Sequence, residues 1–252
     1  MTSVMDFDYE LRHPGHGDQS VHNPHKGGGY QIGSDKSATV EQAADRIRAN
    51  KQAFEQGGGE IVLNPSKQEM DDARESIYQM KREYIASIQP PRELTAKEKD
   101  VVDGMGYANT AIATKQMQDR NNSIVPTARR PTAPEQEYDQ LAIAYTKGPN
   151  GERVVAGAVL FDPAGPHKAY NRTDAIYLGS TGAAKGAGSS LMFTVMNESV
   201  RTQSEFRVKE PVGGALPFYR SMGLDYEGGR TPVMIFTRST KVDDIVKLVN
   251  KP

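Results

Sequence analysis

Residues 174–200 read DAIYLGST, GAAKGAG and SSLMFTVMNESV in succession. The first run is apolar and strand-like, whereas Leu191, Val195 and Met196 in the last run recur at helical spacing. Between the two runs, Gly186 and Gly188 allow the main chain to approach a ligand closely. The stretch therefore predicts a strand, a glycine loop and a helix, whose first N–H groups attract a pyrophosphate. A tight connection with no ligand is the alternative.

A second segment follows at once. The charged, alternating run SEFRVKEPV (204–212) predicts a strand, and GALPFYRSMGL (214–224) predicts a short helix that ends at Gly223. Together the two segments resemble the GNAT superfamily of N-acetyltransferases over about residues 137–240. The family loop Arg/Gln-x-x-Gly-x-Gly/Ala aligns with Ala183-x-x-Gly186-x-Gly188. The later family helix, Ala-x-x-Leu/Phe-Tyr-x-x-x-Gly-Phe, aligns with Ala215-x-x-Phe218-Tyr219-x-x-x-Gly223-Leu224.

The resemblance implies an α/β fold with a mixed, largely antiparallel sheet that is splayed where acetyl-CoA enters and is flanked by helices. It also implies that backbone groups near Ile176 and Leu178 pair with the pantetheine arm. Residues of the loop and the next helix would hold the pyrophosphate: Lys185, Gly186, Ala187, Gly188, Ser189 and Ser190. Tyr219 would protonate the sulfur of coenzyme A, for which a phenol that stays neutral at pH 7 is suited. A tyrosine that only packs in the core is the alternative.

Two positions depart from the family pattern. Ala183 stands where the loop usually has Arg or Gln, and Val212 stands where many members have Asn. The resemblance assigns no general base, because the strand position used by some subfamilies falls near Arg207, and Glu205 and Glu210 only neighbour it. Asp174, at the start of the preceding strand, is a further candidate for that role.

The composition excludes several classes of site. Lys and Arg number 31 against 32 Asp and Glu, so no overall charge indicates nucleic acid or an anionic membrane as a partner. The chain has no cysteine, which excludes disulfides and thiolate chemistry. We expect a soluble, cytoplasmic protein, since no apolar stretch is long enough to span a bilayer and the N-terminus lacks a signal-peptide pattern.

Residues 12–35 are rich in Gly, Pro and His and show no apolar periodicity. Their four histidines, His13, His16, His22 and His25, are compatible with a metal site, but a solvated arm without metal is the expectation. The stretch also resembles a short His/Gly motif of head-associated proteins of tailed phages, which implies phage head proteins as partners and the virion as a second location.

Three capping boxes predict helix starts, at Thr39 with Gln42, Ser66 with Glu69 and Thr95 with Glu98. The second helix carries an apolar stripe made of Met70, Ala73, Ile77, Met80, Tyr84 and Ile88. The third, over 95–118, is weaker and interrupted by two glycines. Residues 60–64 predict a first strand, 121–136 a linker, and 138–162 a hairpin turning at Asn150-Gly151.

The expected organisation is a flexible arm (1–38), an additional helix (39–58) and a GNAT-like domain (59–252). The first hypothesis for function is an N-acetyltransferase that uses acetyl-CoA and transfers acetyl to an amine by direct attack in a ternary complex. The acceptor, whether protein, peptide or small molecule, cannot be read from these residues. The alternative is a structural or interaction protein of a phage particle that keeps the fold with little or no catalysis.

Overall fold

The computed structural model describes residues 37–88, 92–124, 139–165, 171–209, 215–227, 234–236 and 239–251. Its centre is a seven-stranded sheet with the order β1-β2-β3-β4-β5-β7-β6. The strands are β1 (Glu60–Leu63), β2 (Gln140–Lys147), β3 (Arg153–Asp162), β4 (Arg172–Ser180), β5 (Glu205–Val208), β6 (Asp225–Glu227) and β7 (Met234–Phe236). Within these residues β4 and β5 pair in parallel and the other neighbours are antiparallel. The expected mixed, largely antiparallel sheet is confirmed.

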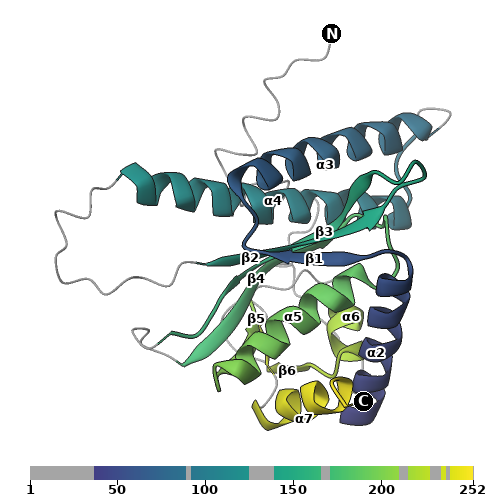
Figure 1. The fold of residues 1–252 in the computed structure, drawn as a ribbon. Coiled ribbons are helices and arrows are strands. Elements are labelled where there is room, and N and C mark those ends of the chain that lie inside the picture. The colour runs from purple at the N-terminus through teal and green to yellow at the C-terminus, as the bar shows by residue number, and fades with distance from the viewer. Residues whose placement is uncertain are drawn as a thin grey trace, which may run out of the picture. The chain divides into compact units, whose positions relative to one another are not determined.

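Helices cover both faces of the sheet (Figure 1). They are α2 (Val40–Gln56), α3 (Lys67–Ser87), α4 (Ala96–Ile124), α5 (Ala187–Arg201), α6 (Leu216–Ser221) and α7 (Ser239–Val249). In Figure 1, α3 and α4 lie on one face, whereas α2, α5 and α7 lie on the other. Two separate groups of buried side chains, one on each face, form the core. The predicted flanking of the sheet by helices is therefore confirmed.

The stripe on α3 faces the sheet, as its periodicity predicts. Met70, Ala73 and Ile77 are buried, and Met80 and Tyr84 pack partly buried beside them. The same core receives residues of α4 and the alternate residues of β2 and β3 that point to this face. The stripe has a packing role, because helix residues three and four apart share one face of the helix.

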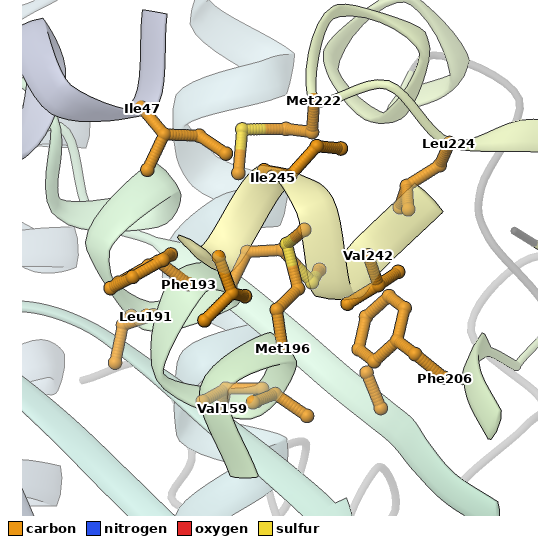
Figure 2. Packing of buried hydrophobic residues seen from close by; sticks show 14 of the residues in the cluster. Ile47, Val159, Leu191, Phe193, Met196, Phe206, Met222, Leu224, Val242 and Ile245 are labelled. Carbon is orange, nitrogen blue, oxygen red and sulfur yellow. The ribbon is translucent and has the colours of Figure 1, made fainter. Parts of the chain in front are cut away.

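The second core lies on the opposite face and joins elements from both ends of the chain. Figure 2 shows Met196 of α5 and Ile245 of α7 pointing into this cluster, together with Ile47 of α2. The sequence analysis set the first helix apart as an addition. In the structure α2 packs against α5 and α7, and residues 37–252 form one compact unit.

The third helix differs from its prediction. Instead of being interrupted, α4 runs unbroken through Gly104 and Gly106, and it continues to Ile124, inside the range that the sequence indicated as a linker. Gly104 is small for a packing reason. A Cβ added there would lie 2.2 Å from the carbonyl oxygen of Ser180, so the helix backbone rests directly on the end of β4.

Several local predictions are confirmed. The three capping boxes form, with hydrogen bonds joining Thr39 to Gln42, Ser66 to Glu69 and Thr95 to Glu98. The hairpin turns at Gly151, whose φ of +81° suits glycine. Helix α7 was not predicted, although Val242, Ile245, Val246 and Val249 follow helical spacing and are buried.

Candidate functional site

Strand β5 is shorter than β4 and pairs with only the first half of it. The two strands pair only from Arg172 with Glu205 to Ala175 with Val208. Beyond that point β4 continues to Ser180, and this part, residues 176–180, pairs with β3 alone among the described residues. We call the β5-facing side of residues 176–180 the open edge. Among the described residues this side of β4 has no partner strand, at the place where the sequence analysis expected the sheet to splay.

The open edge begins at a β-bulge. Leu160 pairs with Tyr177 and Phe161 with Ala175, so that Ile176 is the extra residue on β4. Ile176, Tyr177 and Leu178 are only half-buried, although β4 is the fourth of seven strands. Two predicted site residues, Ile176 and Leu178, thus lie where the main chain of an interior strand has, among the described residues, no neighbouring strand on one side.

Helix α5 begins just after the open edge. Its N-cap, Gly186, has a φ of +85°, and no side chain caps the helix. The helix starts of α2 and α3 each carry a complete capping box. The first N–H groups of α5, at Ala187, Gly188 and Ser189, therefore lack the side-chain acceptor that the other two helices provide. The partial positive charge at this helix end is suited to an anion.

The six predicted phosphate-binding residues fall into different environments. Lys185 is exposed, and Ala187, Ser189 and Ser190 are buried. Gly188 has room, since an added Cβ would come no closer than 3.9 Å to Phe218 and Ser180. The Ser190 hydroxyl oxygen is buried without a hydrogen-bond partner. The start of α5 thus combines open backbone donors with a buried hydroxyl that has no acceptor or donor from the protein.

Gly186 is a glycine for a reason that the sequence did not reveal. A Cβ at Gly186 would lie 2.1 Å from the carbonyl oxygen of Asn50 in α2. The side chain of Asn50 also donates a hydrogen bond to the Ser189 hydroxyl, at 2.9 Å. The missing side chain of Gly186 therefore admits the backbone of α2. Its left-handed conformation is a second reason for glycine, because L residues rarely adopt it.

Tyr219 lies in α6, which follows β5. Its side chain is buried, with 6% of the residue exposed, and its ring meets Phe218 edge-on at 5.3 Å. Phe218 and Ser180 are in turn the residues nearest to a Cβ built on Gly188, each at 3.9 Å. Burial, and then the neighbouring Tyr107 of α4, raises the pKa of Tyr219 to about 12. The phenol is therefore neutral throughout the physiological range, as the predicted role requires.

The backbone around Tyr219 holds this short helix in place. The Tyr219 carbonyl accepts hydrogen bonds from Met222 at 3.0 Å and from Leu224 at 3.1 Å. Gly223, with a φ of +82°, makes the turn that allows these bonds. The glycine of the family-like motif thus closes the helix that carries the tyrosine.

The candidate base Asp174 is held by cations. It is 2% exposed, and its Oδ2 accepts a hydrogen bond from Arg172 Nε at 3.0 Å and lies 3.0 Å from Lys209 Nζ. Arg207 Nε is 3.9 Å from Oδ1. These contacts lie where β4 and β5 still pair, just before the open edge. Asp174 therefore has the contacts of a buried ion-pair partner at Oδ2, whereas Oδ1 is buried without a hydrogen-bond partner among the described residues.

Two residues near the site were not predicted. Asn50 has no local sequence signal, because its contact partner is 139 residues away. Tyr107 lies where α4 packs on β4, since its backbone carbonyl carbon would be 2.8 Å from a Cβ on Gly179. Burial, and then Asp103, raises the pKa of Tyr107. Only the spacing of Gly104 and Tyr107 on one helix face hinted at this arrangement.

Other predicted features lie outside the described residues. These are the histidine arm, with its metal and phage-head interpretations, and Val212 and Glu210. Glu205 is described and exposed. Within the described ranges no group of three or more His, Cys, Asp or Glu side chains could hold a metal ion. Among the helices described, none has the length and apolar character that crossing a bilayer requires.

No protein-family model matches the sequence, and no curated protein matches it. Among solved structures, a mutant AtaT toxin bound to the C-terminus of its antitoxin AtaR and acetyl-CoA is similar with 17% identity and a TM-score of 0.38, over 55% of this chain and 82% of that one. The structure of histone acetyltransferase HPA2 and related acetyltransferase from Corynebacterium glutamicum is similar with 10% identity and a TM-score of 0.37, over 70% of this chain and 93% of that one. The NatC complex bound to Gag peptide and CoA is similar with 14% identity and a TM-score of 0.34, over 70% of this chain and 95% of that one. At such low scores and identities, the chemistry of this chain rests on its own residues.

Proposed function

We propose that this protein is an N-acetyltransferase that uses acetyl-CoA and transfers acetyl to an amine by direct attack in a ternary complex. One observation carries the proposal: the unpaired end of β4, the uncapped start of α5 and α6, the helix that holds Tyr219, adjoin one another, because Ser180 and Phe218 are the residues nearest to a Cβ on Gly188. An extended chain with amide groups, a doubly charged phosphate group and a leaving sulfur each have a matching partner there.

The main chain would provide most of the binding. The edge groups near Ile176 and Leu178 can pair with the amides of a pantetheine arm as a further strand would. The N–H groups of Ala187, Gly188 and Ser189 point along the helix axis and suit a pyrophosphate. The exposed ammonium of Lys185 can add a charge-assisted contact at the rim. Binding through the main chain is also compatible with Ala183, which has no polar side chain to contribute.

Bound acetyl-CoA would supply the acetyl group as a thioester, so that transfer forms a carbon–nitrogen bond, breaks the carbon–sulfur bond and releases one proton from the amine. Tyr219 would donate its hydroxyl hydrogen to the leaving sulfur. With a pKa of about 12, full proton transfer to a thiolate of ordinary pKa is uphill by about 5 kcal/mol. The role that fits the burial of Tyr219 is a strong hydrogen bond from its hydroxyl to the leaving sulfur. The proton is then shared between the two atoms, or water returns a proton to Tyr219 after the transfer.

We assign no carboxylate as the base, since Oδ2 of Asp174 is engaged by Arg172 and Lys209. An amine that arrives neutral, or that loses its proton to water, needs no such base. The acceptor could be a protein, a peptide or a small molecule. We propose that residues 89–94 and those that follow α4, up to 136, choose the acceptor; most of them lie outside the described residues.

The test is calorimetric titration of acetyl-CoA into the full chain and into Gly188→Glu. Gly186 is unsuitable, because any side chain there meets the backbone of α2. Gly188 has space, and an acidic residue in the first turn of a helix is tolerated or stabilising. The new carboxylate would repel the pyrophosphate, so we expect affinity to fall at least about 100-fold with no loss of thermal stability.

Gly106→Glu is the matched control, because it adds the same side chain to a helix at a position with no atom within 4 Å of the new Cβ. It should bind acetyl-CoA like the unmodified protein. Absence of saturable binding of acetyl-CoA by the unmodified protein would overturn the proposal. If Gly188→Glu bound acetyl-CoA as tightly as the unmodified protein, the start of α5 would not be part of the binding site.

A binding protein without turnover is the second candidate. The non-polar Ala183 in the loop and the engagement of Asp174 by cations favour it. This candidate predicts saturable binding of acetyl-CoA but no acetylated product when peptides, polyamines and amino acids are offered as acceptors. Detection of acetylated product by mass spectrometry would exclude it.

A further inference from the structure

Two of the contacts that helix α2 makes with the start of α5 come from Asn50. Its carbonyl oxygen occupies the space that a side chain on Gly186 would need, 2.1 Å from the position of the absent Cβ. Its side-chain Nδ2 donates a hydrogen bond to Ser189 Oγ at 2.9 Å. The N-cap and the third residue of α5 are therefore both located by one residue of another helix.

The direction of the side-chain hydrogen bond matters. Ser189 Oγ accepts from Asn50, so its own hydroxyl hydrogen is left to donate elsewhere. A hydroxyl that accepts one hydrogen bond becomes a better donor of the next, because the bonds of a chain polarise one another. Ser189 is 5% exposed, so water competes little for this arrangement. The first turn of α5 thus contains an oriented hydroxyl donor beside its backbone N–H groups.

Asn50 is not required to hold α2 in place. The apolar contacts of this helix come from Ala43, Ala44, Ile47 and Phe54, which are all buried, whereas Asn50 is only half-buried. Asparagine is also a poorer helix former than alanine. A polar residue with these two contacts, at a position where alanine would suit the helix better, indicates a role at the α5 start.

We propose that Asn50 is a positioning residue for phosphate binding: it acts through Ser189, whose hydroxyl it orients toward an anion at the start of α5. The inference rests on the proposed function, because acetyl-CoA is the ligand that would carry this anion. It assigns a part of the site to α2, the helix that precedes the sheet and that the sequence analysis treated as an addition. The Ser189 hydroxyl would donate to a phosphate oxygen while Asn50 donates to Ser189.

A double-mutant cycle tests the route. Acetyl-CoA affinity is measured by calorimetry for the unmodified chain, Asn50→Ala, Ser189→Ala and the double variant. We expect each single variant to weaken binding about fivefold, the effect of one hydrogen bond, and the double variant to be no weaker than Ser189→Ala alone. Gln52→Ala is the control, because it removes an exposed amide from a different face of the same helix. This variant should bind acetyl-CoA like the unmodified protein.

The outcomes separate this inference from the proposed function. If the unmodified protein does not bind acetyl-CoA, both are overturned. If it binds and Asn50→Ala binds equally well, the positioning role alone is overturned. Additive losses in the double variant would show that Asn50 does not act through Ser189 and would also overturn it.

Asn50→Asp provides a readout that a purely structural contact would not change. The substitution keeps the shape, but it replaces the donor by a carboxylate that would accept the hydrogen of Ser189 and repel a phosphate. We expect a larger loss of affinity than in Asn50→Ala, and a loss that shrinks as salt is raised, because screening weakens the repulsion. A loss equal to that of Asn50→Ala at every salt concentration would contradict the proposed geometry.

Discussion

The two long edges of β4 differ although they belong to one strand. On the β3 side the pairing extends from Asp174 with Asp162 to Ser180 with Gly157, whereas on the β5 side it stops after Ala175. The closed edge is supported by a partner strand of similar length. The open edge has no partner strand among the described residues, because β5 ends at Val208. Helix α4 packs directly on the backbone of Gly179 and Ser180 in this same part of β4. The comparison shows that the length of the neighbouring strand decides which side of β4 is unpaired.

The largest expected effect concerns the packing that keeps α4 on β4. In Gly104→Ala the new methyl group would lie 2.2 Å from the Ser180 carbonyl oxygen, so the helix or the strand must move. We expect unfolding in denaturant to show a loss of about 4 kcal/mol, which is an exceptional cost for a single methyl group. Gly106→Ala, with open space, should gain about 1 kcal/mol from helix propensity. Similar behaviour of the two variants would break the assignment of close packing.

This pair of glycines also shows what a sequence can predict. Gly104 and Gly106 look alike in a helical pattern, and both were interpreted as interruptions. The structure gives them different reasons, because the atoms that surround Gly104 belong to Ser180, far away in the chain. Local patterns did predict the features that depend on neighbours in sequence, such as the capping boxes, the hairpin turn and the glycine loop before α5.

The candidate site was predictable to the same extent. The strand before the loop, the glycine start of α5 and the short helix with Tyr219 follow from short motifs and their order, and the structure forms each of these elements; their joint role as a cofactor site stays a prediction. Asn50 and the packing reason for Gly186 depend on how α2 docks, which no local pattern encodes. The cations around Asp174 come from two strands and likewise required the fold.

Asp174 tests why β4 and β5 stay paired up to the open edge. The substitution Asp174→Asn retains the shape of the side chain and removes its charge. The buried Arg207 and the other two cations then lose the carboxylate of Asp174. We expect Asp174→Asn to lower the free energy of unfolding by about 3 kcal/mol, measured by denaturant titration. Full stability combined with lost turnover would instead identify Asp174 as the base and would sharpen the chemistry of the open edge.

Tyr219 tests whether the open edge is catalytic. Tyr219→Phe removes the hydroxyl and keeps the ring against Phe218. Loss of a positioned proton donor typically costs about 100-fold or more, so we expect kcat to fall about 100-fold with acetyl-CoA affinity unchanged. The assay uses whichever amine gives product in the acceptor screen. Phe218→Leu, which changes the neighbouring ring but keeps the phenol, is the control, and an unchanged kcat in Tyr219→Phe would contradict the assigned role.

The smallest effect compares two buried phenols on the two sides of the sheet. Burial first of all raises the pKa of both Tyr219 and Tyr145 to about 12. An unfolded chain ionises its tyrosines near pH 10, so the contribution of each group is fully present below pH 10 and is lost as the pH rises toward 12. At about pH 11.5 the loss is about 2 kcal/mol for each group.

The free energy of unfolding measured between pH 9 and 11.5 should therefore be less sensitive to alkali in Tyr219→Phe and in Tyr145→Phe than in the unmodified protein. A curve for Tyr219→Phe that follows the unmodified protein would mean that water already reaches this phenol, and that the helices beside the open edge do not shield it.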